Sequence, residues 1–346
     1  MAKKLSRRKF LEITSKDFFA GIVGMSLTRS TRNMLLPSTD CDLVVAKGGS
    51  FSEPFIAAYY RLKVALDAIG GIGYFVSGKK ALIKVNAIDS RYHLGNTSSE
   101  VVGAVVKLCI EAGAKSVTVL SHDKGWEMPI NKHPSLKEAI ISQGGKLLKL
   151  TNNKSYYVKQ PLNKGKWRNL YVAKILYNPD TVLINVPRAK THPWTCYTMC
   201  IKNLMGLVRD MSHFHSTGGA NWTEFPVRLS TAYNYIFRKR IALNILDATY
   251  LVYGWHSPSP EKMGTFKENA IFVGRDALAV DSYAIEMFHR RDPEKFMTSL
   301  EDWNKIGNFY AKYNYSQGNY IKECYALNAG EADLTKLKIK MIDLDS

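Results

Sequence analysis

The chain has 346 residues, of which 46% are hydrophobic and 23% charged, and this composition excludes an intrinsically disordered protein. Lys and Arg outnumber Asp and Glu by 48 to 30, and the net charge of +18 favours anionic partners without choosing among them. Five cysteines are too few, and odd in number, for a disulfide scaffold.

The first residues resemble a bacterial export signal. Residues 6–11 read Ser-Arg-Arg-Lys-Phe-Leu, the pattern of a twin-arginine signal, and the apolar stretch Phe18 to Leu27 is too short to span a bilayer. We therefore predict that residues 1–34 form a signal or N-terminal arm. The export machinery is then a partner, and the protein is periplasmic or otherwise extracytoplasmic. A basic arm docked on the domain or on a membrane surface is the alternative.

Beyond this arm, apolar strands and amphipathic helices alternate. We expect strands at 43–46, 81–85, 116–120 and 146–150, and helices at 55–69, 99–112 and 134–142. Alternation at these lengths predicts parallel strands joined by crossover helices. The predicted fold class is α/β, with a mostly parallel sheet, helices on both faces and insertions.

The second half of the chain continues this pattern less regularly. We expect a hairpin or excursion at 151–167, strands at 182–186, 241–246, 270–273 and 337–342, and helices at 227–237, 278–288 and within 302–325. No segment beyond the arm has the roughly 18 consecutive apolar residues of a transmembrane helix. We predict a single domain over 35–346, with its motifs at about 43–288 and a helical extension at about 289–346.

The segment after the strand at 182–186 is predicted to form a helix. Pro187 ends the strand, Pro193 suits the first helical position, and Gly206 suits the residue just past the end. Thr195, Thr198 and Lys202 would share one helical face, because their spacings are three and four. Backbone N–H groups at the start of such a helix suit a phosphate or a carboxylate.

Polar residues follow four of the predicted strands. They are Asn86, then His122 and Asp123, then Arg188, Lys190 and His192, and finally Asp247. Ligands of open α/β sheets bind beyond the carboxyl ends of the strands, so we expect these residues to converge on one cationic cleft. Ordinary turn and capping chemistry is the alternative for each of them.

Lys84 is anomalous because it interrupts an apolar strand. If that strand is central, the ammonium group must find an anion or a carboxylate, since burial of an unpaired charge is costly. A solvated sheet edge is the alternative.

The sequence lacks the motifs of several common catalytic and phosphate-binding sites. The chain has no GxSxG elbow and no GxxxxGK[ST] phosphate loop, and Ser121, His122 and Asp123 are neighbours that cannot form a triad. Nucleic-acid binding would rest on charge alone, so we predict no nucleic-acid partner.

Metal binding is a weaker alternative. Cys196 and Cys200 are four residues apart on the predicted helix, and His192, His213 and His215 are nearby, so these five are the metal-ligand candidates. Helical cysteines are more often buried as small apolar residues. We assign no metal and leave the cofactor unknown.

Several motifs together carry a family resemblance. They are Ala81 to Asn86, Pro187 to His192 with Thr198, Lys202 to Gly206, His213 to His215, Leu246 to Ala248 with Gly254, and Asp276 to Asp281. On these motifs the chain, from Leu43 to about Phe288, resembles the bacterial and archaeal domain-of-unknown-function 362 family. The resemblance implies an α/β domain of uncharacterised activity. Some relatives carry ferredoxin-like iron–sulfur modules, whose cysteine pattern this chain lacks, and some look distantly similar to the cofactor-binding domain of nickel-pincer lactate racemases.

Our leading hypothesis is an exported protein that binds an anionic small molecule or cofactor in a Lys/His/Asn cleft, as an enzyme whose reaction is unassigned. The expected catalytic residues are His192, Lys190 and Asp247. The expected ligand-binding residues are Lys84, Asn86, Arg188, Thr195, Thr198, Lys202, Asn203 and Asp281. The two alternatives are a non-catalytic cell-envelope protein with a basic surface and a His/Cys metal protein.

Overall fold

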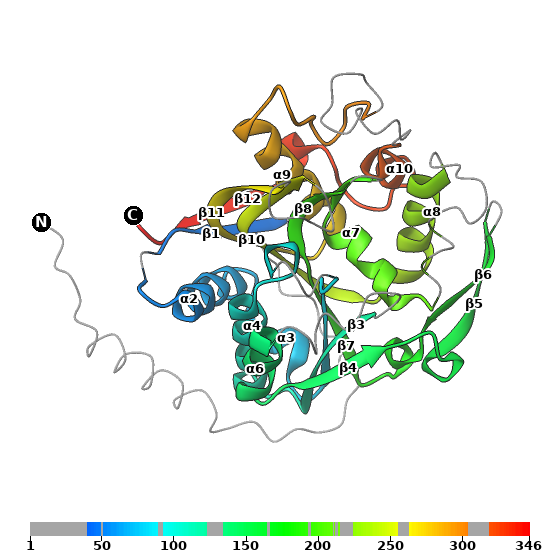
Figure 1. The fold of residues 1–346 in the computed structure, drawn as a ribbon, viewed down its shortest axis with the longest axis horizontal. Coiled ribbons are helices and arrows are strands. Elements are labelled where there is room, and N and C mark those ends of the chain that lie inside the picture. Colours follow the sequence, from blue (N-terminus) through cyan, green and yellow to red (C-terminus); the bar gives the residue numbers. More distant parts are fainter. Residues whose placement is uncertain are drawn as a thin grey trace, which may run out of the picture. The chain divides into compact units, whose positions relative to one another are not determined.

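The computed structural model describes residues 40–49, 51–88, 93–122, 134–164, 167–192, 195–209, 211, 214, 224–254, 263–303 and 318–346. These residues belong to one compact unit, Thr39–Ser346 (Figure 1). The predicted export signal, residues 1–34, lies outside the described residues, as do His213 and His215.

The described part of the chain forms a ten-stranded sheet and a separate two-stranded hairpin. The main path runs β12-β1-β11-β10-β7-β2-β3-β4, and β8 and β9 extend it beside β10. All neighbours on this path are parallel except those of β11, which is antiparallel to both β1 and β10. The strands are β1 (Leu43–Lys47), β2 (Lys80–Val85), β3 (Ser116–His122), β4 (Lys146–Leu150), β5 (Tyr157–Lys164), β6 (Trp167–Ala173), β7 (Thr181–Val186), β8 (Arg188–His192), β9 (Cys196–Thr198), β10 (Ile241–Gly254), β11 (Met263–Gly274) and β12 (Ile339–Asp343).

Helices cover both faces of the sheet, as Figure 1 shows. The first face carries α2 (Pro54–Asp67), α3 (Gly73–Val76), α4 (Ser99–Glu111) and α6 (Pro134–Ser142). The second carries α7 (Cys200–Asn203), α8 (Glu224–Ala232), α9 (Ala277–Arg291) and α10 (Tyr320–Ala326). The predicted α/β class, with a mostly parallel sheet and helices on both faces, is therefore confirmed.

Each face of the sheet has its own apolar core, which the alternation of side chains along the strands creates. On β2, Ile83 and Val85 belong to the core under α2 and α4, whereas Leu82 belongs to the core under α7 and α9. The same alternation on β10 sends Ile245 to the first core and Leu246 to the second. These two patterns fix the face to which each polar side chain near the strand ends points.

The predicted helix from Pro193 to Gly206 is wrong in its first half. The chain instead adds two short strands, because β8 pairs with β10 in parallel and β9 folds back antiparallel onto β8. Cys196, at φ 54°, takes the left-handed conformation where the chain reverses, and α7 begins only at Cys200. Thr195, Thr198 and Lys202 therefore do not share a helical face.

Other boundaries also differ from expectation. β10 has 14 residues, eight more than the strand expected at 241–246, because it continues past the end of β7 to pair with β8 and β11. The helical extension is described only in part, as α10, since residues 304–317 lie outside the described residues. Within the described ranges, no helix combines the length and apolarity needed to cross a membrane.

Candidate functional site

Polar side chains gather at the carboxyl ends of β2, β3 and β7, but on both faces of the sheet. Lys84 lies between Ile83 and Val85 on β2 and therefore faces the core under α7. Asp247 lies between Leu246 and Ala248 on β10 and therefore faces α4. The single cleft expected from the sequence is thus two clusters at one edge of the sheet.

Lys84 is the centre of the cluster on the α7 face. Its side chain is buried, and its Nζ donates to the carbonyl oxygen of Val85 (2.6 Å) and to Oδ1 of Asn203 (3.0 Å). Gly206 packs directly on this amine, since a Cβ atom there would lie 2.6 Å from Cε and 2.8 Å from Nζ of Lys84. A glycine is required at position 206 because its backbone lies too close to the Lys84 side chain for a Cβ atom to fit.

A second amine, that of Lys202, lies close to the first. Burial and the positive charge of Lys202 lower the pKa of Lys84 to about 7, and burial lowers the pKa of Lys202 to about 7 as well. Lys202 Nζ lies 5.9 Å from the centre of the Phe225 ring, while the Lys202 side chain keeps partial contact with solvent. Among the described residues, no carboxylate pairs with either amine.

A chain of asparagines connects Lys84 to the middle of the sheet. Asn203 Nδ2 donates to Oδ1 of Asn185 (2.9 Å), and Asn185 Nδ2 donates to Oδ1 of Asn244 (2.9 Å). Asn244 Nδ2 in turn donates to the carbonyl oxygen of Arg275 (3.1 Å). Because buried polar groups must be hydrogen-bonded, this chain fixes α7 on the strands and thereby fixes Asn203 beside Lys84.

The cluster on the α4 face is built around a buried ion pair. Arg188 Nη1 lies 3.0 Å from Oδ1 of Asp247, and both side chains are almost fully buried. Arg188 Nε donates to the carbonyl oxygen of Asn96 (2.9 Å), and Nη2 donates to Oγ of Ser98 (3.0 Å). Asp247 Oδ2 accepts from both the backbone N–H (2.8 Å) and the Oγ (2.5 Å) of Ser98. The pair therefore joins β8, β10 and the segment that leads into α4.

Lys190 and His192 lie on the same strand as Arg188, two and four residues further along β8. Lys190 Nζ donates to the carbonyl oxygen of Gly95 (2.6 Å), so this cation also holds the 93–98 segment. Across the β8–β9 ladder, Lys190 is opposite Thr198 and His192 is opposite Cys196. Opposite residues of an antiparallel pair share a face, so the pairing brings His192 and Cys196 together.

The remaining predicted site residues have structural contacts. Asp281 accepts from the backbone N–H groups of Cys200 (2.7 Å) and Ile201 (3.0 Å), so it holds the start of α7, and burial raises its pKa to about 7. Thr195 Oγ1 donates to the carbonyl oxygen of Tyr197 (2.8 Å).

Asn86 lies beside Thr97, and its backbone N–H donates to Thr97 Oγ1 (2.9 Å). Its Oδ1 atom is buried and accepts no hydrogen bond from the described residues. No group of three or more His, Cys, Asp or Glu residues in the described part of the chain is placed to hold a metal.

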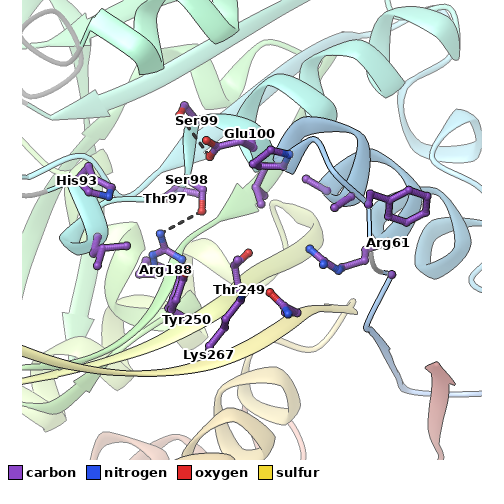
Figure 2. A pocket seen from close by; sticks show the side chains of 18 of the residues that line it. Arg61, His93, Thr97, Ser98, Ser99, Glu100, Arg188, Thr249, Tyr250 and Lys267 are labelled. Atoms are coloured by element: carbon purple, nitrogen blue, oxygen red, sulfur yellow. Dashed lines mark hydrogen bonds between the residues drawn. The ribbon is translucent and has the colours of Figure 1, made fainter. Parts of the chain in front are cut away.

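A cavity of about 660 Å³ lies against the Arg188 cluster (Figure 2). Arg61 from α2, Arg188 from β8, Thr249 from β10 and Lys267 from β11 line it, together with the start of α4. Lys84, Lys190 and Lys202 do not line it. Arg61 and Lys267 were not predicted from the sequence. Lys267 resembles a solvated surface cation, whereas Arg61 had a signal, because it falls on the apolar face of α2 between Ala58 and Ala65.

Asn185 and Asn244 were also not predicted as site residues, although the sequence pattern marks both. Each interrupts an apolar strand, as Lys84 does in β2. The same criterion that selected Lys84 would have selected both.

Comparison with known proteins gives a family but no activity. Residues 81–286 match the family described as domain of unknown function (DUF362). No curated protein matches the chain. One solved structure similar to this chain, the crystal structure of a Thermotoga maritima protein from a structural genomics consortium, has 13% sequence identity and a TM-score of 0.42. The match covers 70% of this chain and 60% of that one, so the chain spans less than two thirds of that protein's length.

Replacing Gly206 with alanine should displace the Lys84 amine. We expect the free energy of unfolding to fall by about 1–3 kcal/mol, because the added Cβ would force Lys84 away from Asn203 and Val85. Urea unfolding measures this loss. In a Lys84→Ala background the atoms that clash are gone, so Gly206→Ala should then cost little. An equal loss in both backgrounds would show that Gly206 does not act through Lys84.

Replacing Asp247 with asparagine should destabilise the protein strongly. Removing the carboxylate leaves the Arg188 charge buried without a counter-charge, which costs about 3–5 kcal/mol. Asp67→Asn is the matched control, since Asp67 pairs with Lys63 on the exposed side of α2 and should cost no more than about 1 kcal/mol. Equal unfolding midpoints for the two variants would contradict the role given to Asp247.

Proposed function

The chain belongs to the family DUF362, and from the geometry of its site we propose that it binds an anionic small molecule at the Lys84–Lys202 pair. The single observation that carries this proposal is two neighbouring amines, one buried and one partly buried, without a carboxylate partner among the described residues. Two cations in one desolvated place repel each other, and an anion between them would relieve that repulsion.

The contacts of Lys84 and Lys202 differ in a way that suits a ligand. Lys84 already donates to two neutral oxygen atoms, so it is held in position. Lys202 makes no hydrogen bond with the described residues and keeps some contact with solvent, so its N–H groups are available. An anion that reached Lys202 would lie beside an amine positioned by Asn203.

We extend the proposal to an enzyme. An amine with a pKa of about 7 gains and loses its proton near neutral pH, which is the property of an efficient acid–base group. His122, at the end of β3, is near the same place, since its Cβ lies 3.7 Å from where a Cβ of Gly206 would be. The substrate and the reaction are not assigned by these contacts.

Anion binding at this pair should weaken as the pH rises. Sulfate keeps its charge between pH 6 and pH 9, whereas an amine whose pKa is about 7 must first take up a proton to bind it above pH 7. For each linked proton, the affinity should therefore fall about tenfold per pH unit above pH 7. Isothermal titration calorimetry at pH 6, 7.5 and 9 measures this slope, and a flat profile would contradict the proposal.

The variant Lys202→Met should weaken sulfate binding and remove from its pH dependence the one proton that Lys202 takes up. Lys202 has no hydrogen bond to lose within the described residues, so the variant should fold normally. Lys63→Met, which removes an exposed amine of α2, is the matched control and should bind like the wild type. Native mass spectrometry of both variants, purified from the native host, should show a retained small molecule only in the control.

We also propose that the protein is exported by the twin-arginine route, which the sequence at Arg7 and Arg8 supports. Changing both arginines to lysine should retain the protein in the cytoplasm, because the receptor recognises the arginine pair. Fractionation of the host cell measures this. Export that is unchanged in the double variant would contradict the proposal.

A further inference from the structure

The cavity beside Arg188 is separate from the lysine pair and has no role in the function proposed above. Its volume of about 660 Å³ is within the usual range for small-molecule sites. It lies on the α4 face of the sheet, whereas Lys84 faces α7. Whatever it binds is therefore held by different residues.

Arg61 is the unusual feature of this cavity. It comes from the middle of α2 and is 5% exposed, so its guanidinium is almost fully buried. Nε donates to the carbonyl oxygen of Gly48 (2.6 Å), and neither Nη atom has a partner among the described residues. In Figure 2 the side chain points toward the space bordered by Ser98, Thr249 and Arg188. Asp345 and Asp247 are near enough to interact electrostatically with Arg61, but neither accepts a hydrogen bond from it, so both Nη groups can still donate to a ligand.

The start of α4 supplies further donors. This helix has 13 residues, and no side chain caps its amino terminus, because Ser98 donates its Oγ to Asp247 instead. Ser99, Glu100 and Val101, the first residues of the helix, line the cavity. Uncapped N–H groups and the helix dipole favour an anion at this position.

The charges around the cavity are mixed. Lys267 is exposed at its edge and has no partner among the described residues, while Glu100 and Asp345 add two carboxylates to the lining. The lining does not attract anions through an excess of positive charge. The selective element is the fork of Arg61, whose two Nη groups match two oxygen atoms of one oxyanion.

We propose that this cavity binds the oxyanion group, a carboxylate or a phosphate, of a small molecule, with Arg61 as the principal partner. The N–H groups of the first turn of α4 and the hydroxyl of Thr249 complete the oxyanion's contacts, and Lys267 lies at the entrance. Arginine stays protonated at all accessible pH values, so the charge of Arg61 does not change between pH 6 and pH 9.

Calorimetric titration at pH 8.5 tests this proposal, because the Lys84–Lys202 pair is then largely uncharged. Inorganic phosphate and acetate serve as separate probes, and the one that binds more tightly identifies the oxyanion. We expect saturable binding to the wild type and a loss of about 10- to 100-fold in Arg61→Met, since one charged two-point contact is removed. Lys63→Met, on the exposed side of the same helix, should bind like the wild type.

Two further variants separate binding from folding. Glu100→Gln should bind the probe several-fold more tightly, because it removes a carboxylate from the lining without changing its shape. Lys202→Met should leave this binding unchanged, so a failure here is distinct from a failure at the lysine pair. Absence of saturable binding of both probes to the wild type, or equal affinity in a folded Arg61→Met variant, overturns the proposal. If Arg61→Met does not fold, the Glu100→Gln variant decides. A probe affinity equal to that of the wild type then overturns the proposal.

Discussion

The buried ion pair of Arg188 and Asp247 is the contact on which the geometry of this edge of the sheet depends. Neither charge has access to water, so each must be matched by the other and by neutral polar groups. The groups that match them are the backbone and side chain of Ser98 and the carbonyl oxygen of Asn96. As a result, residues 96–98 are held against β8 and β10, and the amino terminus of α4 is fixed where it meets the cavity.

Buried cations have different partners on the two faces of the sheet. On the α4 face a cation is neutralised by a carboxylate at 3.0 Å. On the α7 face, Lys84 meets only the neutral oxygens of Val85 and Asn203. Burial lowers the pKa of both Lys84 and Lys202, and the charge of Lys202 lowers that of Lys84 further. The first arrangement fixes the geometry of the strand ends, whereas the second leaves two amines whose charge changes near neutral pH and which we propose bind an anion.

Much of the fold was predictable because strand and helix periodicities are local. The strand at β4 and the helix α6 have the predicted bounds, and β2, α2 and α4 begin or end within two residues of them. The prediction of a helix from Pro193 was wrong because pairing with a strand far away in the sequence overrode the local helix pattern. Residues 188–192 and 196–198 form strands only because β10 extends far enough to offer β8 an edge with which to pair.

From the sequence alone it follows that Lys84 interrupts an apolar strand and that polar groups follow the strand ends, because side-chain alternation and apolar runs are properties of short segments. The sheet order then places that strand between β7 and β3, which buries Lys84 and excludes the solvated edge. Only the tertiary structure decided which groups meet. Lys84 and Asn203 are 119 positions apart, and Arg61 and Ser99 reach one cavity from two different helices. Such meetings depend on strand order and on the face to which each side chain points, and a shift of one residue in register would send the same side chain to the opposite core.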